Sequence, residues 1–267
     1  MGYTRLIFTF TNSIEYEYHY IGNCGAKGEK RAARQKKTPE EQQRVNQRRK
    51  ERDMRHLIKA NFFPNDIWVT LKYPKGLRKP LEEIKKDFRK FLTKLRNSYK
   101  LMGEPLKYIY RMEIGSRGGI HIHMIINRSR GRPDTEVLIQ ELWTEGRANY
   151  QNLYEAGGYK DLAEYIVKQP DKRCMRQISF FEPEEQKDFI KYSCSRNLIR
   201  PEPERREYKQ WTLRKLIDEG PKPKPGFYID KDSIEYGINP FTGMSYLRYT
   251  EVRLKEIKRN DYGGGYG

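Results

Sequence analysis

The sequence has no long apolar segment and few cysteines, and these absences exclude several classes of protein. No run approaches the roughly 20 apolar residues that a membrane-spanning helix needs. The N-terminus carries a short apolar stretch without a clear cleavage site, which argues against a signal peptide. The three cysteines, Cys24, Cys174 and Cys194, are odd in number and lack metal-type spacing. We therefore expect reduced thiols in a cytoplasmic protein.

Apolar residues are also scarce, whereas positive charge is abundant. Hydrophobic residues make up 36% of the 267 residues and charged residues 34%, so part of the chain must be solvated arms rather than core. The net charge is 54 − 36 = +18. A surplus of this size favours a polyanionic partner, with nucleic acid as the first candidate and an anionic membrane surface as the weaker one. The length suffices for one large domain, or for a domain with an appendage.

The middle of the chain alternates between the periodicity of strands and that of helices. Hairpin-linked strands with interleaved helices predict an α+β fold, a central antiparallel sheet with flanking helices that cover one face. The expected elements are strands over 66–73, 106–114, 120–126 and 149–154 and helices over 81–101, 135–143 and 158–169.

Two extensions flank this region, so we expect three parts. Residues 1–60 form an N-terminal hairpin and a basic helix, which begins at Thr38 with a capping sequence. Residues 61–205 form the central domain. Residues 206–267 form a C-terminal helix and hairpin with a disordered glycine-rich tail.

A candidate metal site lies in the frame Glu113-Ile-Gly-Ser-Arg-Gly-Gly-Ile-His121, which continues into His123. Residues two apart on a strand share one face, so both imidazoles point the same way. If the preceding strand pairs with this one, Glu113 stands beside them, and such a nitrogen and oxygen set suits a divalent cation. The alternatives are a packing or surface His pair, and a Glu113 that merely pairs with Arg111 or Arg117.

A second candidate group is Tyr165 with Lys168, which a separation of three places on one helix face. A tyrosine is a weak nucleophile because its pKa is near 10, and a neighbouring ammonium group lowers that pKa. The alternative is a tyrosine that packs the core. Three other tyrosines could instead serve as the nucleophile: Tyr154, Tyr159 and Tyr192.

These motifs together resemble the HUH endonucleases. His121-Ile122-His123 resembles their His-hydrophobic-His motif, and Tyr165-Ile-Val-Lys168 resembles their Tyr-x-x-Lys motif. The segment Asp66-Ile-Trp-Val-Thr-Leu-Lys-Tyr73 is similar to the first motif of rolling-circle replication initiators, and the order of the three motifs is that of the initiators. The segment 192–198 is similar to a stretch in replication proteins of phages and plasmids of Gram-positive bacteria. The resemblance covers about residues 60–200.

The resemblance implies a fold, a reaction and roles for five residues. It implies a ferredoxin-like palm in which Mg²⁺ or Mn²⁺ is held by His121, His123 and, as third ligand, Glu113. Tyr165 attacks a DNA phosphodiester, becomes linked to the 5′ end and releases a 3′ hydroxyl that primes replication, and Lys168 positions or activates it. A reverse transfer rejoins the strand.

Two departures from the family pattern refine the predicted type of enzyme. No second tyrosine lies one helical turn from Tyr165, which indicates a single-tyrosine enzyme. No Gly-x-x-x-x-Gly-Lys-Ser/Thr phosphate loop is present, so a host helicase must unwind the duplex and a host polymerase extend the primer, in the cytoplasm of a bacterial host. Two other functions remain open: a single-tyrosine transposase, and a non-catalytic DNA-binding regulator of replication.

Basic and polar residues near these motifs are candidates for contact with single-stranded DNA or an origin hairpin. Phosphate contacts dominate such affinity, and the basic helix could also be simply a solvated face. The predicted contacts are Arg48, Arg49, Arg52, Lys72, Arg111, Arg117, Arg196 and Asn197.

Overall fold

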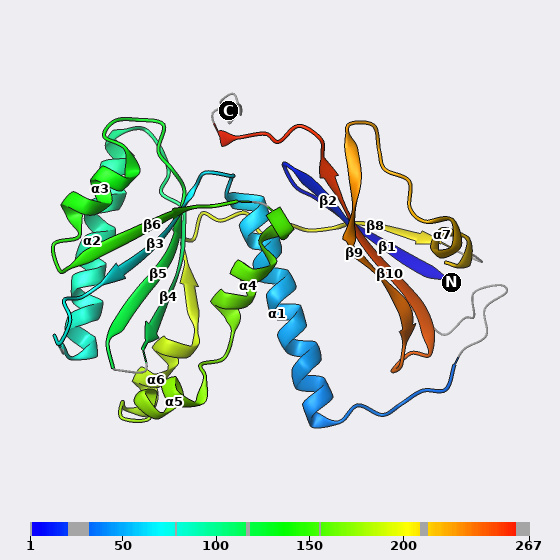
Figure 1. The fold of residues 1–267 in the computed structure, drawn as a ribbon, viewed down its shortest axis with the longest axis horizontal. Coiled ribbons are helices and arrows are strands. Elements are labelled where there is room, and N and C mark those ends of the chain that lie inside the picture. Colours follow the sequence, from blue (N-terminus) through cyan, green and yellow to red (C-terminus); the bar gives the residue numbers. More distant parts are fainter. Residues whose placement is uncertain are drawn as a thin grey trace. The chain divides into compact units, whose positions relative to one another are not determined.

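The chain forms an α+β fold with two antiparallel five-stranded sheets, which confirms the predicted fold class. The computed structural model describes residues 2–20, 32–77, 79–115, 118–154, 156–208 and 213–259. Two compact units result (Figure 1): unit 1 is Met1–Asn46 with Arg200–Ile257, and unit 2 is Gln47–Ile199 with Lys258–Gly267. The two predicted extensions therefore belong largely to one unit rather than to two parts.

Unit 1 is built on a sheet that joins strands from both ends of the chain. Its order is β8-β1-β2-β10-β9, and all the pairings are antiparallel. The strands are β1 (Tyr3–Thr9), β2 (Ser13–Tyr20), β8 (Glu204–Tyr208), β9 (Phe227–Asn239) and β10 (Met244–Arg253), and a short helix within the unit is α7 (Arg214–Glu219). The N-terminal and C-terminal hairpins were both predicted. The C-terminal helix was predicted over 208–217, whereas Tyr208 ends strand β8 and helix α7 begins at Arg214.

Tyrosine rings fill much of the core of unit 1. The β2 strand lies inside the sheet, between β1 and β10, so residues on both of its faces are buried. The rings of Tyr16 and Tyr249 stack with centroids 4.7 Å apart, and Tyr18 stacks on Tyr249. Stacked aromatic pairs add stabilisation beyond the area they bury.

Unit 2 is built on a second sheet, in the order β6-β3-β5-β4-β7. The chain order of these strands follows the predicted pattern, and β6 and β7 form the two edges. The strands are β3 (Ile67–Lys72), β4 (Tyr108–Ile114), β5 (Ile120–Ile126), β6 (Arg147–Asn152) and β7 (Tyr192–Cys194).

Helices cover both faces of this sheet, not one face as the sequence had suggested (Figure 1). The amphipathic helix α2 (Leu81–Leu101) and the short α3 (Thr135–Leu142) bury apolar residues against one face. Helices α1 (Pro39–Asn61) and α4 (Lys160–Val167) pack on the other. Both faces need cover because the strands carry apolar residues on each side.

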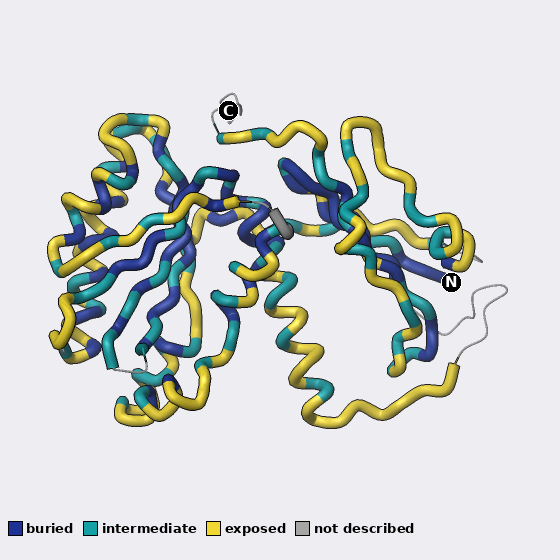
Figure 2. The backbone as a smooth tube through the Cα atoms, in the orientation of Figure 1, coloured by how far each residue is buried: buried dark blue, intermediate teal, exposed yellow. Residues whose placement is uncertain are grey.

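Buried and less buried residues alternate along the strands of unit 2 (Figure 2). This alternation decides which residues face which helices. In β5, Ile120, Ile122 and Met124 point to the core with α2 and α3. His121 and His123 therefore point to the opposite face, where α1 and α4 lie. The sheet thus separates a continuous apolar core from a face that carries ionisable groups.

Two further features of unit 2 complete the description. A 3₁₀ turn (Ala156–Tyr159) precedes α4, and helices α5 (Lys172–Ile178) and α6 (Pro183–Ile190) follow it. Helix α5 was not predicted. Gly146 stands where an added Cβ would lie 2.0 Å from the carbonyl oxygen of Lys72. Only glycine permits β6 to begin this close to β3.

The basic helix α1 begins with the predicted capping interaction at Thr38. The Thr38 hydroxyl accepts the Glu41 N–H and the Glu41 carboxylate accepts the Thr38 N–H, which is a capping box. Cys174 and Cys194 are both free, and Cys24 lies outside the described residues. Within the described ranges, no helix combines the length and apolar character that crossing a bilayer requires.

Candidate active site

The hairpin of β4 and β5 brings the predicted carboxylate and imidazoles together. Glu113 stands directly opposite His121 in the antiparallel register, and Arg111 stands opposite His123. The turn is closed by a hydrogen bond from the Gly115 N–H to the Gly119 carbonyl, with Gly118 at a positive φ of 75°. The predicted hairpin and its shared face are thus present.

Helix α4 brings Tyr165 to the same face from a distant part of the sequence. Ala163, Ile166 and Val167 are buried against the sheet, and this packing turns the tyrosine ring toward the strands. The Tyr165 hydroxyl donates to the Glu113 carboxylate and lies 3.0 Å from Nε2 of His123. Three side chains from three elements therefore meet at one hydroxyl group.

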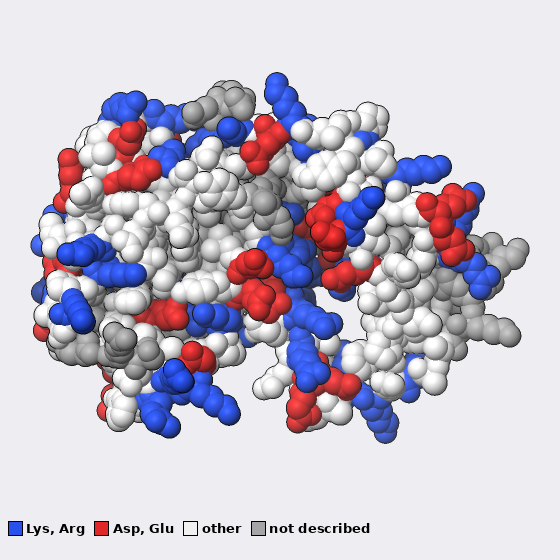
Figure 3. Space-filling model, viewed as in Figure 1, with Lys and Arg blue, Asp and Glu red and all other residues white. Residues whose placement is uncertain are grey.

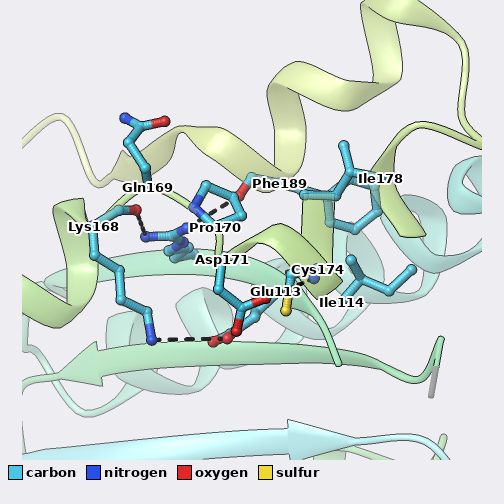
Figure 4. A pocket seen from close by; sticks show the side chains of 10 residues that line it. Glu113, Ile114, Lys168, Gln169, Pro170, Asp171, Cys174, Ile178 and Phe189 are labelled. Atoms are coloured by element: carbon cyan, nitrogen blue, oxygen red, sulfur yellow. Dashed lines mark hydrogen bonds and ion pairs between the residues drawn. The ribbon is translucent and has the colours of Figure 1, made fainter. Parts of the chain in front are cut away.

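Lys168 joins this group from just beyond the helix. The helix ends at Val167, and Lys168 has an extended conformation rather than a position on the helix face. Its Nζ lies 4.1 Å from the centroid of the Tyr165 ring and 4.0 Å from a Glu113 oxygen. Figure 4 shows the amine reaching the carboxylate across a small cavity of about 70 Å³, which Cys174 also lines.

Arg111 is buried beneath this group and holds the end of α4. Its guanidinium donates to the carbonyls of Tyr165, Ile166 and Lys168, at 3.3, 3.0 and 2.6 Å, and also to the carbonyl of Phe189. The residue is 2% exposed. This burial is at odds with the predicted contact of Arg111 with nucleic acid. The guanidinium instead satisfies carbonyls that a helix end leaves without partners.

Two residues of β3 fix the orientation of His123. The Thr70 hydroxyl lies 3.1 Å from Nδ1 of His123, which leaves Nε2 for Tyr165 and Glu113. The Trp68 ring stacks on the imidazole, with centroids 5.5 Å apart and an angle of 15° between the planes. A second hydrogen bond of this kind sets the tautomer and direction of an imidazole ligand.

The surroundings of Tyr165 favour its neutral phenol over the reactive phenolate. Burial and the hydrogen bond to the Glu113 carboxylate raise the pKa of Tyr165 well above its ordinary value. Hydrogen bonds from His123 and Tyr165, with the charge of Lys168, lower the pKa of Glu113 to about 2 despite its partial burial. The sequence had suggested that Lys168 lowers the pKa of the phenol, but Glu113 outweighs it in this arrangement.

The donor atoms of this cluster fit a divalent cation chemically, although they are not closed around one. Within the described residues, no three His, Cys, Asp or Glu side chains are grouped to hold a metal ion. Glu113 and His123 form a pair with 3.3 Å between oxygen and nitrogen, and the His121 and His123 ring centroids are 6.2 Å apart. Burial, followed by the charges of Lys72 and His123, lowers the pKa of His121, which favours the neutral imidazole that binds metals.

The rival tyrosines differ from one another in exposure, and Tyr154 and Tyr159 line a pocket together with His123 and Tyr165. Tyr159 is buried at 4% exposure, whereas Tyr154 is 69% exposed and Tyr192 is 39% exposed. It is the Tyr165 hydroxyl that donates to the Glu113 carboxylate and lies 3.0 Å from Nε2 of His123.

The remaining predicted contacts with nucleic acid fall in several places. Lys and Arg side chains gather along α1 (Figure 3), where Arg48 and Arg49 are exposed and Arg52 pairs with Asp53. Lys72 is the neighbour of His121 in the register of β3 and β5. Arg196 and Asn197 are exposed, with Asn197 also donating to a backbone carbonyl, and Arg117 lies outside the described residues.

The row of polar residues along β6 was not predicted from the sequence. Arg147, Asn149 and Gln151 are exposed and lie on the same side of the sheet as the Tyr165 cluster. These residues alternate with Ala148 and Tyr150, which is a strand pattern. The pattern could have revealed them if the exposed side of the strand had been assigned to the face that carries the histidines.

Comparison with known proteins supports a role in replication. Residues 66–170 match the model of the family described as Replication-associated protein ORF2/G2P. This segment contains Thr70, Glu113, both histidines of β5, Tyr165 and Lys168, and the match is consistent with a rolling-circle replication initiator. No curated protein and no solved structure matches the chain.

Proposed function

We propose that this protein is a metal-dependent nickase and strand transferase that starts replication at a single-stranded origin. The observation that carries the proposal is the meeting of the Tyr165 hydroxyl with Glu113 and His123, since these residues come from α4, β4 and β5. A phenol beside a carboxylate and an imidazole is a nucleophile next to a candidate cation site. The match to a replication-associated family supports the same reading.

Each residue has a defined task in the proposed reaction. Glu113, His121 and His123 would hold the cation, which when bound polarises the scissile phosphate. If Glu113 ligated a cation instead of the phenol, Tyr165 would lose the acceptor that, with burial, raises its pKa, and Lys168 would remain as a neighbouring positive charge. Thr70 keeps the His123 imidazole in its orientation.

The bonds of the nicking step balance without a further reactant. The Tyr165 oxygen forms a bond to phosphorus, and the bond between phosphorus and the 3′ oxygen breaks. The phenol proton ends on the released 3′ oxygen, which becomes the primer hydroxyl. The reverse step rejoins the strand, because the phosphotyrosine bond preserves the energy of the original phosphodiester.

A covalent trapping experiment tests this proposal. The full chain is incubated with circular single-stranded DNA and with a random-sequence single-stranded library, in Mn²⁺ or in EDTA, and is then denatured in SDS. We expect a protein–DNA adduct in Mn²⁺ and none in EDTA, and the adducted peptide should contain Tyr165. The Tyr165→Phe variant should give none, and the control Tyr192→Phe, at another of the rival tyrosines, should give the wild-type amount.

Two outcomes would contradict the proposal. An adduct that persists in Tyr165→Phe would assign the nucleophile elsewhere. DNA binding that ignores both metal and His121→Ala, without any adduct, would favour a non-catalytic regulator of replication.

A further inference from the structure

One half of the active face carries exposed polar residues for which the reaction has no use. The β6 strand forms a free edge of the unit 2 sheet, next to β3. Its residues Arg147, Asn149 and Gln151 are exposed and project to the face that holds the histidines of β5. The register pairs each of them with a β3 residue of that face: Arg147 with Lys72, Asn149 with Thr70, and Gln151 with Trp68.

These side chains are available to a ligand. Within the described part of the chain, neither the guanidinium of Arg147 nor the amides of Asn149 and Gln151 make any hydrogen bond or ion pair. The neighbouring Asn152 differs, because its amide oxygen accepts a hydrogen bond from Arg128. The three free groups run in one line along the strand edge.

A pocket of about 560 Å³ opens between this edge and α4. Its lining includes Gln151, Trp68, Tyr154, Leu162 and, at the end nearest the reaction, His123 and Tyr165. The volume lies within the range of about 300–1,000 Å³ that is usual for pockets that take a small organic group. The Tyr165 ring therefore borders both this pocket and the candidate cation site.

The chemistry of the lining suits an unpaired nucleobase. Aromatic rings such as that of Tyr154 offer stacking surfaces, which is how proteins hold the bases of single strands. A side-chain amide offers a donor and an acceptor to the edge of a base, so Gln151 can distinguish one base from another. Arg147 and Lys72 place positive charge beside it for the backbone phosphates.

We propose that this pocket takes one unstacked base of the single strand adjacent to the scissile phosphate, and that Gln151 reads the edge of that base. Arg147 and Lys72 hold the neighbouring phosphates without regard to sequence. The proposal rests on the proposed function for its substrate, single-stranded DNA, and adds to it a residue that determines specificity.

Binding without cleavage tests this inference. Fluorescence anisotropy of the full chain in EDTA gives affinities for twelve-nucleotide homopolymers of deoxyadenosine, deoxycytidine and thymidine. We expect Gln151→Ala to change the ratio of these affinities by at least about fivefold. Gln151→Glu, which keeps the size but removes the donor, should alter the ratio differently.

Two matched variants separate base reading from general effects. Arg147→Gln should weaken the binding of all three homopolymers by one common factor. It should also reduce the slope of log affinity against log salt concentration by about 0.7, the value for one lost phosphate contact. Gln140→Ala removes an exposed glutamine of α3, which covers the opposite face, and should change nothing.

The outcomes distinguish this inference from the proposed function. Unchanged affinity ratios in Gln151→Ala, or tighter binding of a duplex than of any single strand, would overturn the base pocket even if the adduct with Tyr165 forms. Base-selective binding that depends on Gln151 would uphold the pocket even if no adduct forms with any DNA.

Discussion

The hydroxyl of Tyr165 donates a hydrogen bond to the carboxylate of Glu113, although 52 residues separate them in the sequence. The same carboxylate is a candidate cation ligand, so the phenol and the cation compete for one group. Burial and this contact raise the pKa of Tyr165, whereas hydrogen bonds from His123 and Tyr165 lower the pKa of Glu113, so the phenol stays protonated. In the proposed mechanism this arrangement is a resting state, in which Tyr165 is held in place but not activated.

This competition predicts that removing the phenol improves metal binding. Tyr165→Phe should bind Mn²⁺ about fivefold more tightly than the wild type, because a hydrogen bond worth about 1 kcal/mol no longer opposes the cation. Calorimetric titration without DNA measures the affinity, with Tyr154→Phe as the control. Weaker binding in Tyr165→Phe would mean that the phenol oxygen is itself a ligand.

The hydrogen bond between Thr70 and His123 predicts an indirect effect on the same titration. Thr70→Val keeps the shape of the side chain but removes the partner of Nδ1, so the imidazole loses its fixed orientation. The affinity for Mn²⁺ should fall by about tenfold, as for other partners of metal-binding histidines. Thr70→Ser should restore it. An unchanged affinity in Thr70→Val would show that Trp68 alone orients the ring.

The buried guanidinium of Arg111 predicts a loss of stability rather than a loss of charge for DNA. Arg111→Met leaves the carbonyls at the end of α4 without a donor and should lower the free energy of unfolding by about 3 kcal/mol. Urea denaturation measures this. The control Arg196→Met, at an exposed site, should change the free energy of unfolding by at most about 0.5 kcal/mol. A stable Arg111→Met protein with weakened DNA binding would restore the original prediction for this residue.

The sequence predicted the histidine strand and its partner well, because their signals are local. Alternation places His121 and His123 on one face, and the glycines between the strands indicate the turn that sets Glu113 opposite. Spacing along a helix also predicted that Lys168 lies near Tyr165; the two are close, but Lys168 lies just beyond the helix in an extended conformation. The convergence of that helix with the strands could only be inferred from the resemblance, since no local pattern encodes it.

Other features could not be read from local patterns because they depend on the whole sheet. Arg111 resembles a surface cation in sequence, but it is buried where it donates to carbonyls at the end of α4 and in α6. The N-terminal and C-terminal hairpins look like separate appendages, yet β10 pairs with β2 across more than 220 residues of sequence. Pairings between such distant segments carry no periodicity of their own.

The ion pair between Asp66 and Arg259 predicts a strong dependence of unit 2 on its C-terminal segment. The Asp66 side chain is fully buried, and Arg259 donates to it at 2.9 and 2.5 Å. Arg259→Ala should lower the free energy of unfolding by about 3 kcal/mol, because it leaves a buried carboxylate short of a counter-charge. Lys187→Ala breaks the exposed pair with Glu184 and should cost at most about 0.5 kcal/mol. Equal effects of the two substitutions would contradict this difference.

The buried carboxylate of Glu251 predicts a pH dependence of stability in unit 1. Glu251 is 2% exposed, and its burial raises its pKa although the Tyr16 hydroxyl donates to it. The folded state therefore binds a proton more readily than the unfolded state, so this group's contribution to stability is present at low pH and is lost as pH rises through the folded pKa. Glu251→Gln keeps an acceptor for Tyr16 and should raise the free energy of unfolding at neutral pH by roughly 1 kcal/mol, with the gain vanishing toward pH 4. Urea denaturation at several pH values measures this, with the exposed Glu235→Gln as the control. A gain that grows as pH falls would contradict the sign of the shift.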